Sequence, residues 1–340
     1  MKLTDSKVFI VAELSANHGH EIQIAKDTIK AAKEAGADAV KIQTYTPDTI
    51  TLDCDNEYFQ IKQGTVWDGT TFYKLYQQAY TPWEWHQELF DYSKEIGITL
   101  FSSPFDKTAV DLLEKLDAPV YKIASFEITD IPLIEYVASK GKPVIISTGI
   151  ATIEEIKEAV DTCKKMGNNS ITLLKCTSAY PSPYEEMNLN TIPNMKETFG
   201  VNVGLSDHSI GSTVAIGAVA LGATIVEKHV ILDRNIGGPD SSFSMEMNEF
   251  KEMINEIRNI ERALGKINYD LNEKTLKNRE FSRSLFFTEN IEAGQLITEK
   301  NMRSIRPGYG LHPRHYQELL GKRTSKKIEK GTPVDWSLTE

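Results

Sequence analysis

The segment GLSDHS at positions 204–209 ends one short apolar run, and the segment EKH at positions 227–229 ends the next. If the two runs form neighbouring parallel strands, both segments lie at the carboxyl edge of the sheet, where α/β proteins bind their ligands. His208 and His229 would then converge, and two neutral imidazoles with carboxylates nearby suit a borderline divalent metal. The alternative is two unrelated histidines at strand ends, because the spacing is not the i, i+4 zinc signature.

The same alternation of apolar runs and helix-like segments extends over most of the chain. Eight apolar runs are too hydrophobic to be half-solvated strands, so we expect both faces of the sheet to be covered. Eight parallel strand–helix units of this size favour an α/β fold that closes into a (β/α)8 TIM barrel. The predicted strands cover residues 7–14, 38–44, 98–102, 120–124, 143–147, 171–175, 201–205 and the run from 223 onward.

The composition and hydrophobic pattern of the sequence change after Gly265. Residues 1–265 hold the barrel pattern, whereas residues 266–280 are polar and charged and read as a linker. Residues 281–340 have short alternating runs and Gly-containing turns, which predict a small β-rich domain. A second irregular stretch, residues 45–81, interrupts the barrel pattern after the second strand, and an insertion of that length is typical of a functional loop.

Composition excludes several classes of protein. A net charge of −10 argues against a nucleic-acid partner, which requires a basic footprint. The longest apolar run near the start is broken at Glu13, so it predicts neither a signal segment nor a membrane span. The three cysteines are scattered and odd in number, which predicts a reducing, cytoplasmic location without a disulfide framework.

Lys41 and Lys122 interrupt apolar runs, so their ammonium groups are expected to be partly buried. They could pair with a barrel carboxylate such as Glu13 or Glu227. Together with the Ser and Thr hydroxyls at other strand ends, they could instead form a pocket for phosphate and carboxylate. A lysine in an apolar strand also suits an imine-forming aldolase, and this alternative stays open from the residues alone.

Ten short motifs spread along the chain resemble those of the sialic acid synthase family. They are AELSANH (12–18), KIQT (41–44), SSPF (102–105), YKIAS (121–125), STG (147–149), LKCTSAYP (174–181), GLSDHS, EKH, RSL (283–285) and RPGYGLHP (306–313). The resemblance implies a barrel that condenses phosphoenolpyruvate with an acylamino sugar aldehyde, followed by an antifreeze-like (SAF) domain. The Trp67-Asp68 insertion and the sequence at 310–313 resemble the branch of the family that uses a doubly acylated 6-deoxy sugar.

The resemblance also implies roles for individual residues. His208 and His229 would hold a divalent metal ion, usually Mn²⁺ with Mg²⁺ or Co²⁺ as alternatives, and act with Glu13 in catalysis. The expected phosphoenolpyruvate-binding residues are Lys41, Ser103, Lys122, Ser125, Ser147 and Ser206. The expected sugar-binding residues are Gln43, Glu127, Tyr180, Asp240 and Arg306.

The expected partners are these two small substrates and a second copy of the chain. In the family, an arginine of the C-terminal domain reaches the barrel of the partner subunit, and Arg306 matches it, so the resemblance implies a domain-swapped homodimer. The family's C-terminal domain also resembles antifreeze protein, which leaves a pure binding role as a third hypothesis beside the synthase and the aldolase.

Overall fold

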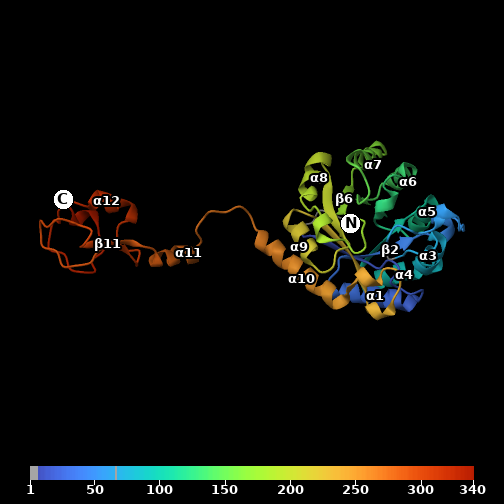
Figure 1. Ribbon diagram of the computed structural model, residues 1–340, viewed down its shortest axis with the longest axis horizontal. Helices are drawn as coiled ribbons and strands as arrows, with labels where there is room; N and C mark the ends of the chain where they lie inside the picture. Colours follow the sequence, from blue (N-terminus) through green and yellow to red (C-terminus); the bar gives the residue numbers. More distant parts are fainter. Residues whose placement is uncertain (1–6, 66) are drawn as a thin grey trace. The chain divides into compact units, whose positions relative to one another are not determined.

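The computed structural model describes residues 7–65 and 67–340, and the chain forms two compact units, Met1–Gly265 and Lys266–Glu340 (Figure 1). In the described part of the chain, no helix combines the length and the apolar character needed to span a bilayer.

The first unit is a closed barrel of parallel strands. Each strand pairs with the next along the chain, and β1 also pairs with β8, which closes the ring. The strands are β1 (Phe9–Glu13), β2 (Ala39–Thr44), β3 (Thr99–Pro104), β4 (Tyr121–Ile123), β5 (Val144–Ser147), β6 (Ile171–Cys176), β7 (Asn202–Asp207) and β8 (Ile225–Ile231), with a short β9 (Met245–Glu246) added beside β8. The predicted TIM barrel is therefore confirmed.

Helices surround the strands, as Figure 1 shows for α1 and α4 to α10. They are α1 (Ile22–Ala35), α4 (His86–Ile96), α5 (Lys107–Lys115), α6 (Ile131–Ala138), α7 (Ile153–Lys165), α8 (Thr191–Phe199), α9 (Thr213–Ala220) and α10 (Met247–Leu264). The start of α7 matches its sequence signal, because the Thr152 hydroxyl accepts a hydrogen bond from the backbone N–H of Glu155 in a capping box. The insertion after β2 contains two further helices, α2 (Pro47–Ile50) and α3 (Phe72–Ala79).

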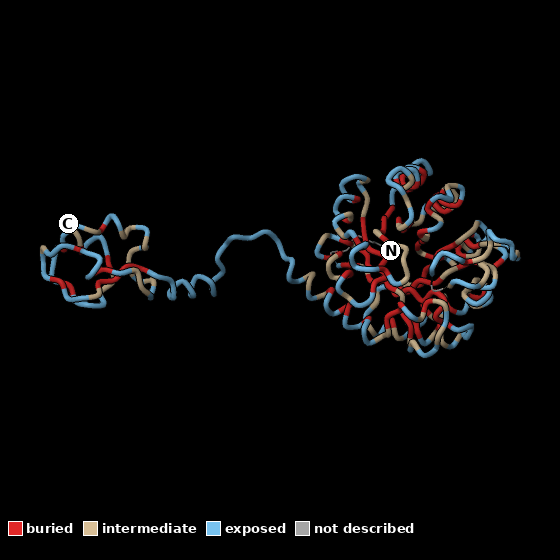
Figure 2. The backbone as a smooth tube through the Cα atoms, viewed as in Figure 1, coloured by how far each residue is buried: buried red, intermediate tan, exposed pale blue. Residues whose placement is uncertain are grey.

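Apolar side chains fill two layers of the barrel unit. The larger layer lies between strands and helices, and Figure 2 shows the strands and the inner sides of the helices as buried. The smaller layer is a plug of apolar side chains in the lumen, contributed by six of the eight main strands and by Val120, which directly precedes β4. Its buried members are Val11, Ala39, Phe101, Val120, Ile145, Leu174 and Ile225.

The second unit has a core of its own around an antiparallel strand pair. Strand β10 (Ser284–Phe287) pairs with β11 (Met302–Ile305), and isolated bridges such as Ile291 with Ile328 extend the pairing. A short helix α12 (Tyr316–Leu319) packs on this core through Leu319. The stretch predicted as a linker is not uniformly irregular, because it contains the helix α11 (Glu273–Asn278).

Candidate active site

The strand period of two places the candidate side chains above the apolar plug. Successive side chains of a strand point to opposite faces, so the residue two places after a plug residue also points into the lumen. Glu13 follows Val11 in this way, and Lys41 follows Ala39. The same step leads to Ser103, Lys122, Ser147, Cys176 and Glu227 on the other strands, and one further step on β8 reaches His229.

Four buried charged groups form a continuous ion-pair network in the lumen. The Nζ atom of Lys41 lies 2.7 Å from Oε2 of Glu13 and 3.8 Å from Oε1 of Glu227. The same Glu227 oxygen lies 3.7 Å from Nζ of Lys122. All four side chains are at most 5% exposed, and both lysines are paired with barrel carboxylates.

Serine hydroxyls surround this network. Lys122 Nζ donates to Ser147 Oγ at 2.7 Å, and Lys41 Nζ lies 3.3 Å from Ser103 Oγ. Ser206 donates to Oε1 of Glu227 at 3.1 Å. Ser125 is buried and accepts a hydrogen bond from Ser178, which belongs to the LKCTSAYP motif.

Burial and pairing oppose each other in setting the protonation of the network. Burial acts to lower the pKa of Lys41, but the carboxylates of Glu13 and Glu227 outweigh it and hold this pKa above its ordinary value. Burial lowers the pKa of Lys122, and Glu227 opposes the shift. Burial raises the pKa of Glu13 in spite of Lys41, which suits a carboxylate that must accept a proton. Lys41 therefore stays protonated, which disfavours imine chemistry at this residue.

The two histidines lie side by side, with ring centroids 5.2 Å apart. Nδ1 of His208 lies 3.2 Å from the carbonyl oxygen of Thr177 and 3.8 Å from the sulfur of Cys176, so Nε2 is the nitrogen of this ring left for a ligand. Nδ1 of His229 is buried without a hydrogen-bond partner among the described residues. Burial lowers the pKa of His229 well below its ordinary value, which keeps this imidazole neutral.

A bound metal ion explains these contacts better than two unrelated histidines at strand ends. A buried imidazole nitrogen without a partner is costly unless it binds a ligand. Among the described residues, no cluster of three or more His, Cys, Asp or Glu side chains has metal-binding geometry, so His208 and His229 would need water or substrate to complete the coordination. Burial acts to lower the pKa of His208, but the neighbouring Cys176 outweighs it and raises this pKa above its ordinary value.

Aromatic rings lie against the histidines. The Tyr180 ring is 4.3 Å from the His208 ring, and Phe243 is 5.2 Å from both Tyr180 and His229. Trp67, from the insertion, packs 5.3 Å from Tyr180 and donates its indole N–H to the carbonyl of Pro239 at 2.9 Å. The insertion thus contributes an aromatic side chain to the same part of the barrel as the histidines.

The other candidate residues divide into three groups. Gln43 and Asp240 are joined to Glu13 through hydrogen bonds that include Ser15, a residue that sequence reasoning missed. Glu127 follows β4, and burial raises its pKa to about 7, while its Oε2 atom has no partner among the described residues. Arg306 follows β11 in the second unit and is exposed.

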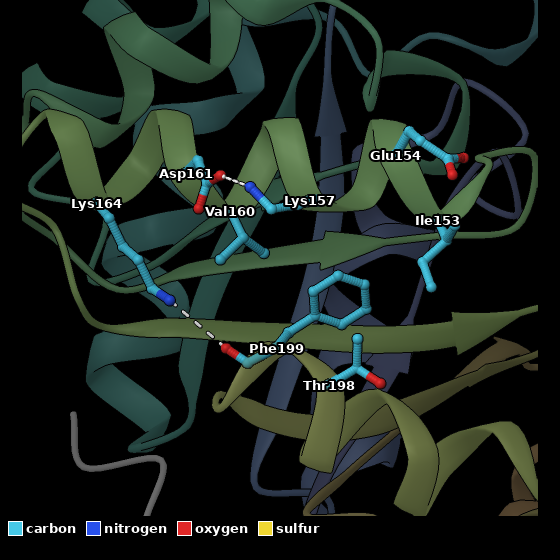
Figure 3. A pocket seen from close by; sticks show the side chains of 8 residues that line it. All are labelled: Ile153, Glu154, Lys157, Val160, Asp161, Lys164, Thr198 and Phe199. Carbon is cyan, nitrogen blue, oxygen red and sulfur yellow. Dashed lines mark hydrogen bonds and ion pairs between the residues drawn. The ribbon is translucent and has the colours of Figure 1, made fainter.

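A surface groove of about 350 Å³ lies apart from this constellation, between α7 and α8 on the outer layer of the barrel (Figure 3). Lys157 and Asp161 form an exposed ion pair along it, and Lys164 lies 3.5 Å from the carbonyl oxygen of Phe199. None of the side chains that line this groove is among the polar residues of the barrel lumen.

Comparison with known proteins finds a matching family model for each of the two units. The NeuB family model matches residues 28–269, and the SAF domain model matches residues 282–338. A pseudaminic acid synthase of Campylobacter jejuni is 52% identical over 328 residues, covering 96% of this chain and 95% of that protein. An N,N'-diacetyllegionaminic acid synthase of the same species is 36% identical, over 95% of this chain and 97% of that protein.

Solved structures agree with these matches. The crystal structure of the spore coat polysaccharide biosynthesis protein SpsE of Bacillus subtilis superposes with a TM-score of 0.66 at 35% identity, covering 98% of this chain and 95% of that one. The family model spans most of the barrel, and the full-length relatives include both units. The chain therefore belongs to the NeuB family, as a barrel followed by a SAF domain.

Proposed function

We propose that the chain is a pseudaminic acid synthase. It condenses phosphoenolpyruvate with 2,4-diacetamido-2,4,6-trideoxy-altrose and water, and it releases pseudaminic acid and phosphate. The observation that carries the reaction class is the buried network of Glu13, Lys41, Lys122 and Glu227 beside two histidines in a NeuB-family barrel. The choice of sugar rests on the higher identity to a pseudaminic acid synthase than to a legionaminic acid synthase, 52% against 36%.

Lys41 and Lys122 bind the anionic groups of phosphoenolpyruvate in this proposal. Lysine binds phosphate as a point charge, and charge-assisted hydrogen bonds are stronger than neutral ones. Ser103 and Ser147 already contact the two ammonium groups, and Ser206 contacts Glu227, so these hydroxyls lie where they can share the same anion. Ser125 completes this set from its buried position after β4.

Glu13 is the proposed base for the water that adds to carbon 2. Carbon 3 of phosphoenolpyruvate attacks the aldehyde carbon, which leaves a positive charge at carbon 2, and the aldehyde oxygen takes a proton from solvent water. Water loses a proton to Glu13 as its oxygen bonds to carbon 2, and the resulting intermediate collapses to a ketone with cleavage of the carbon–oxygen bond to phosphate. A carboxylate with a raised pKa is better matched to this proton transfer than a fully exposed one.

His208 and His229 are the proposed ligands of a divalent metal ion, which we take to be Mn²⁺, with Mg²⁺ or Co²⁺ as alternatives. When bound, such an ion supplies Lewis-acid polarisation of the sugar aldehyde. Gln43, Glu127, Tyr180 and Asp240 form the sugar side of the site. The reaction takes place in the cytoplasm in this proposal, since Cys54, Cys163 and Cys176 are all free thiols.

We further propose a domain-swapped homodimer in which Arg306 serves the barrel of the partner subunit. The planar guanidinium suits a carbonyl of an acylamino group. None of the polar side chains that we assign to the barrel lumen is an arginine. The segment before β10 exposes large apolar side chains, with Ile267 at 92%, Tyr269 at 91% and Phe281 at 68% exposure. Apolar groups exposed in this way favour burial against a second copy.

The reaction and the sugar are tested together by measuring phosphate release with the precursor sugars of pseudaminic, legionaminic and N-acetylneuraminic acids. We expect kcat/KM to be highest for the pseudaminic precursor, by roughly 100-fold, because a mismatched sugar leaves buried polar groups unpaired. A preference for another precursor would change the sugar and leave the reaction class intact. No phosphate release with any of the three would contradict the proposed reaction.

The variants His208→Ala and His229→Ala test the metal assignment. Each should bind Mn²⁺ more weakly and lose more activity than the roughly 100-fold that removal of an outer-shell partner costs, because each removes a ligand itself. Mn²⁺ binding is measured by calorimetry and turnover by phosphate release. His20→Ala is the matched control, since this imidazole is exposed, and it should behave as wild type. Near-normal Mn²⁺ binding in either lumen variant would refute the assignment.

The variant Lys122→Met removes an ammonium group from the proposed phosphoenolpyruvate pocket while keeping the length of the side chain. The KM for phosphoenolpyruvate should rise by roughly 10- to 150-fold, because one charge-assisted contact is worth about 1.5–3 kcal/mol. The KM for the sugar should change much less. Lys175→Met is the control, because Lys175 donates to the Cys176 carbonyl and lies outside the ion-pair network. A larger effect on the sugar would reverse the assignment of the pocket.

Subunit exchange between two inactive variants tests the domain swap. In a swapped heterodimer of Arg306→Ala and His208→Ala, both lesions fall in one site and the other site is intact. Activity should therefore return to about a quarter of wild type at equal mixing, since half of the dimers are mixed and each has one good site. Arg303→Ala is the control, because Arg303 is an exposed arginine on β11 just before Arg306, and this variant should be active alone. Demonstrated exchange without recovered activity would show that Arg306 does not complete the partner's site.

A further inference from the structure

Ser15 has a backbone conformation that a serine adopts only at a cost. Its φ is 49°, in the left-handed region, where the Cβ atom of an L-residue is crowded. Three other non-glycine residues among those described have positive φ, namely His20, Asp117 and Asn188, and these are exposed, whereas Ser15 is 3% exposed. Glycine adopts this φ freely, so the turn itself does not need the serine side chain.

The Ser15 hydroxyl hydrogen-bonds two side chains from distant parts of the sequence. It donates to Oδ2 of Asp240 and accepts from Nε2 of Gln43 at 3.1 Å. Nε2 of Gln43 also donates to Oε1 of Glu13 at 3.0 Å. One hydroxyl therefore connects strands β1 and β2 to the segment after β8.

These hydrogen bonds determine which atoms remain available to a ligand. Both amide protons of Gln43 are used, so Oε1 is the polar atom of that amide left to accept a hydrogen bond. Oδ2 of Asp240 receives the Ser15 hydroxyl and lies 3.4 Å from the backbone N–H of Ala16, and Oδ1 has no hydrogen bond within the described residues. Two acceptor oxygens are thus held in fixed orientations by the same serine.

We propose that Ser15 is a positioning residue for sugar specificity. Its hydroxyl orients the Gln43 amide and the Asp240 carboxylate so that both present acceptor oxygens to N–H and O–H donors of an acylamino sugar. This inference rests on the proposed function, which assigns Gln43 and Asp240 to the sugar side of the site. Ser15 itself acts through these two residues, and the backbone strain accompanies the placement of its hydroxyl.

Two substitutions of Ser15 distinguish the role of its hydroxyl from that of the backbone turn. Ser15→Gly removes both the hydroxyl and the crowded Cβ atom, whereas Ser15→Ala removes only the hydroxyl. We expect Ser15→Gly to melt no lower than Ser15→Ala, because glycine relieves the left-handed strain. Both variants should raise the KM for the sugar about tenfold or more, which corresponds to about 1.4 kcal/mol, and leave the KM for phosphoenolpyruvate within about twofold.

The preference among sugars is the second measurement. The ratio of kcat/KM for the doubly acylated sugar to that for N-acetylmannosamine should fall about tenfold in both variants, because misoriented acceptors discriminate less between donors. Asp117→Gly is the matched control, since it relieves the same kind of backbone conformation on an exposed turn. It should leave both KM values and the sugar preference at the wild-type level.

Calorimetric titration of the sugar into the protein gives an affinity that does not depend on turnover. A wild-type protein that binds the sugar but releases no phosphate contradicts the proposed function, and weaker binding by Ser15→Gly then still supports the role of Ser15. Wild-type affinity and wild-type sugar preference in Ser15→Gly would overturn the inference. Equal increases of both KM values would also overturn it, because they would indicate a general structural effect.

Discussion

The proposed active site depends on the burial of four charges in the barrel lumen. Moving Lys41, Lys122, Glu13 and Glu227 out of water costs several kcal/mol per ion, and the mutual attraction offsets this only when each charge has a close partner. Apolar residues of similar volume would give comparable or greater stability in such a place. The network is therefore poorly explained as a stabilising device, and its position above an apolar plug is better explained by the anionic substrate that we propose it binds.

The fold and most of this lumen follow from local sequence patterns. Apolar runs and helix signals recur with the barrel rhythm, and the period of two carries each strand from a plug residue to a polar side chain at its end. Lys41 and Lys122 could be selected because a lysine inside an apolar run is exceptional. Serine gives a weaker signal, since hydroxyls are common at strand ends.

The remainder of the site depends on contacts that no local pattern encodes. The partnership of Ser15 with Asp240 joins residues 225 positions apart, and the sequence gives no sign that the turn after β1 has a left-handed serine. The stretch 266–280 is polar, and α11 forms within it with Asn272 capping its first turn. A motif shared with a family can identify Arg306 as a candidate, but the side chain lies in a separate compact unit.

The net charge of the proposed site depends on both the ion-pair network and the histidine pair. The four buried groups sum to zero when both carboxylates are ionised, so by themselves they offer no net attraction to a polyanion such as phosphoenolpyruvate. His229 adds no charge, because burial keeps its imidazole neutral. A divalent cation at His208 and His229 would make the lumen positive, and protonation of Glu13, whose pKa burial raises, would act in the same direction. The unpaired nitrogen of His229 and the ion-pair network therefore act together in this proposal. The neutral imidazole can bind a divalent cation, and the positive charge of that cation would attract the anionic phosphoenolpyruvate.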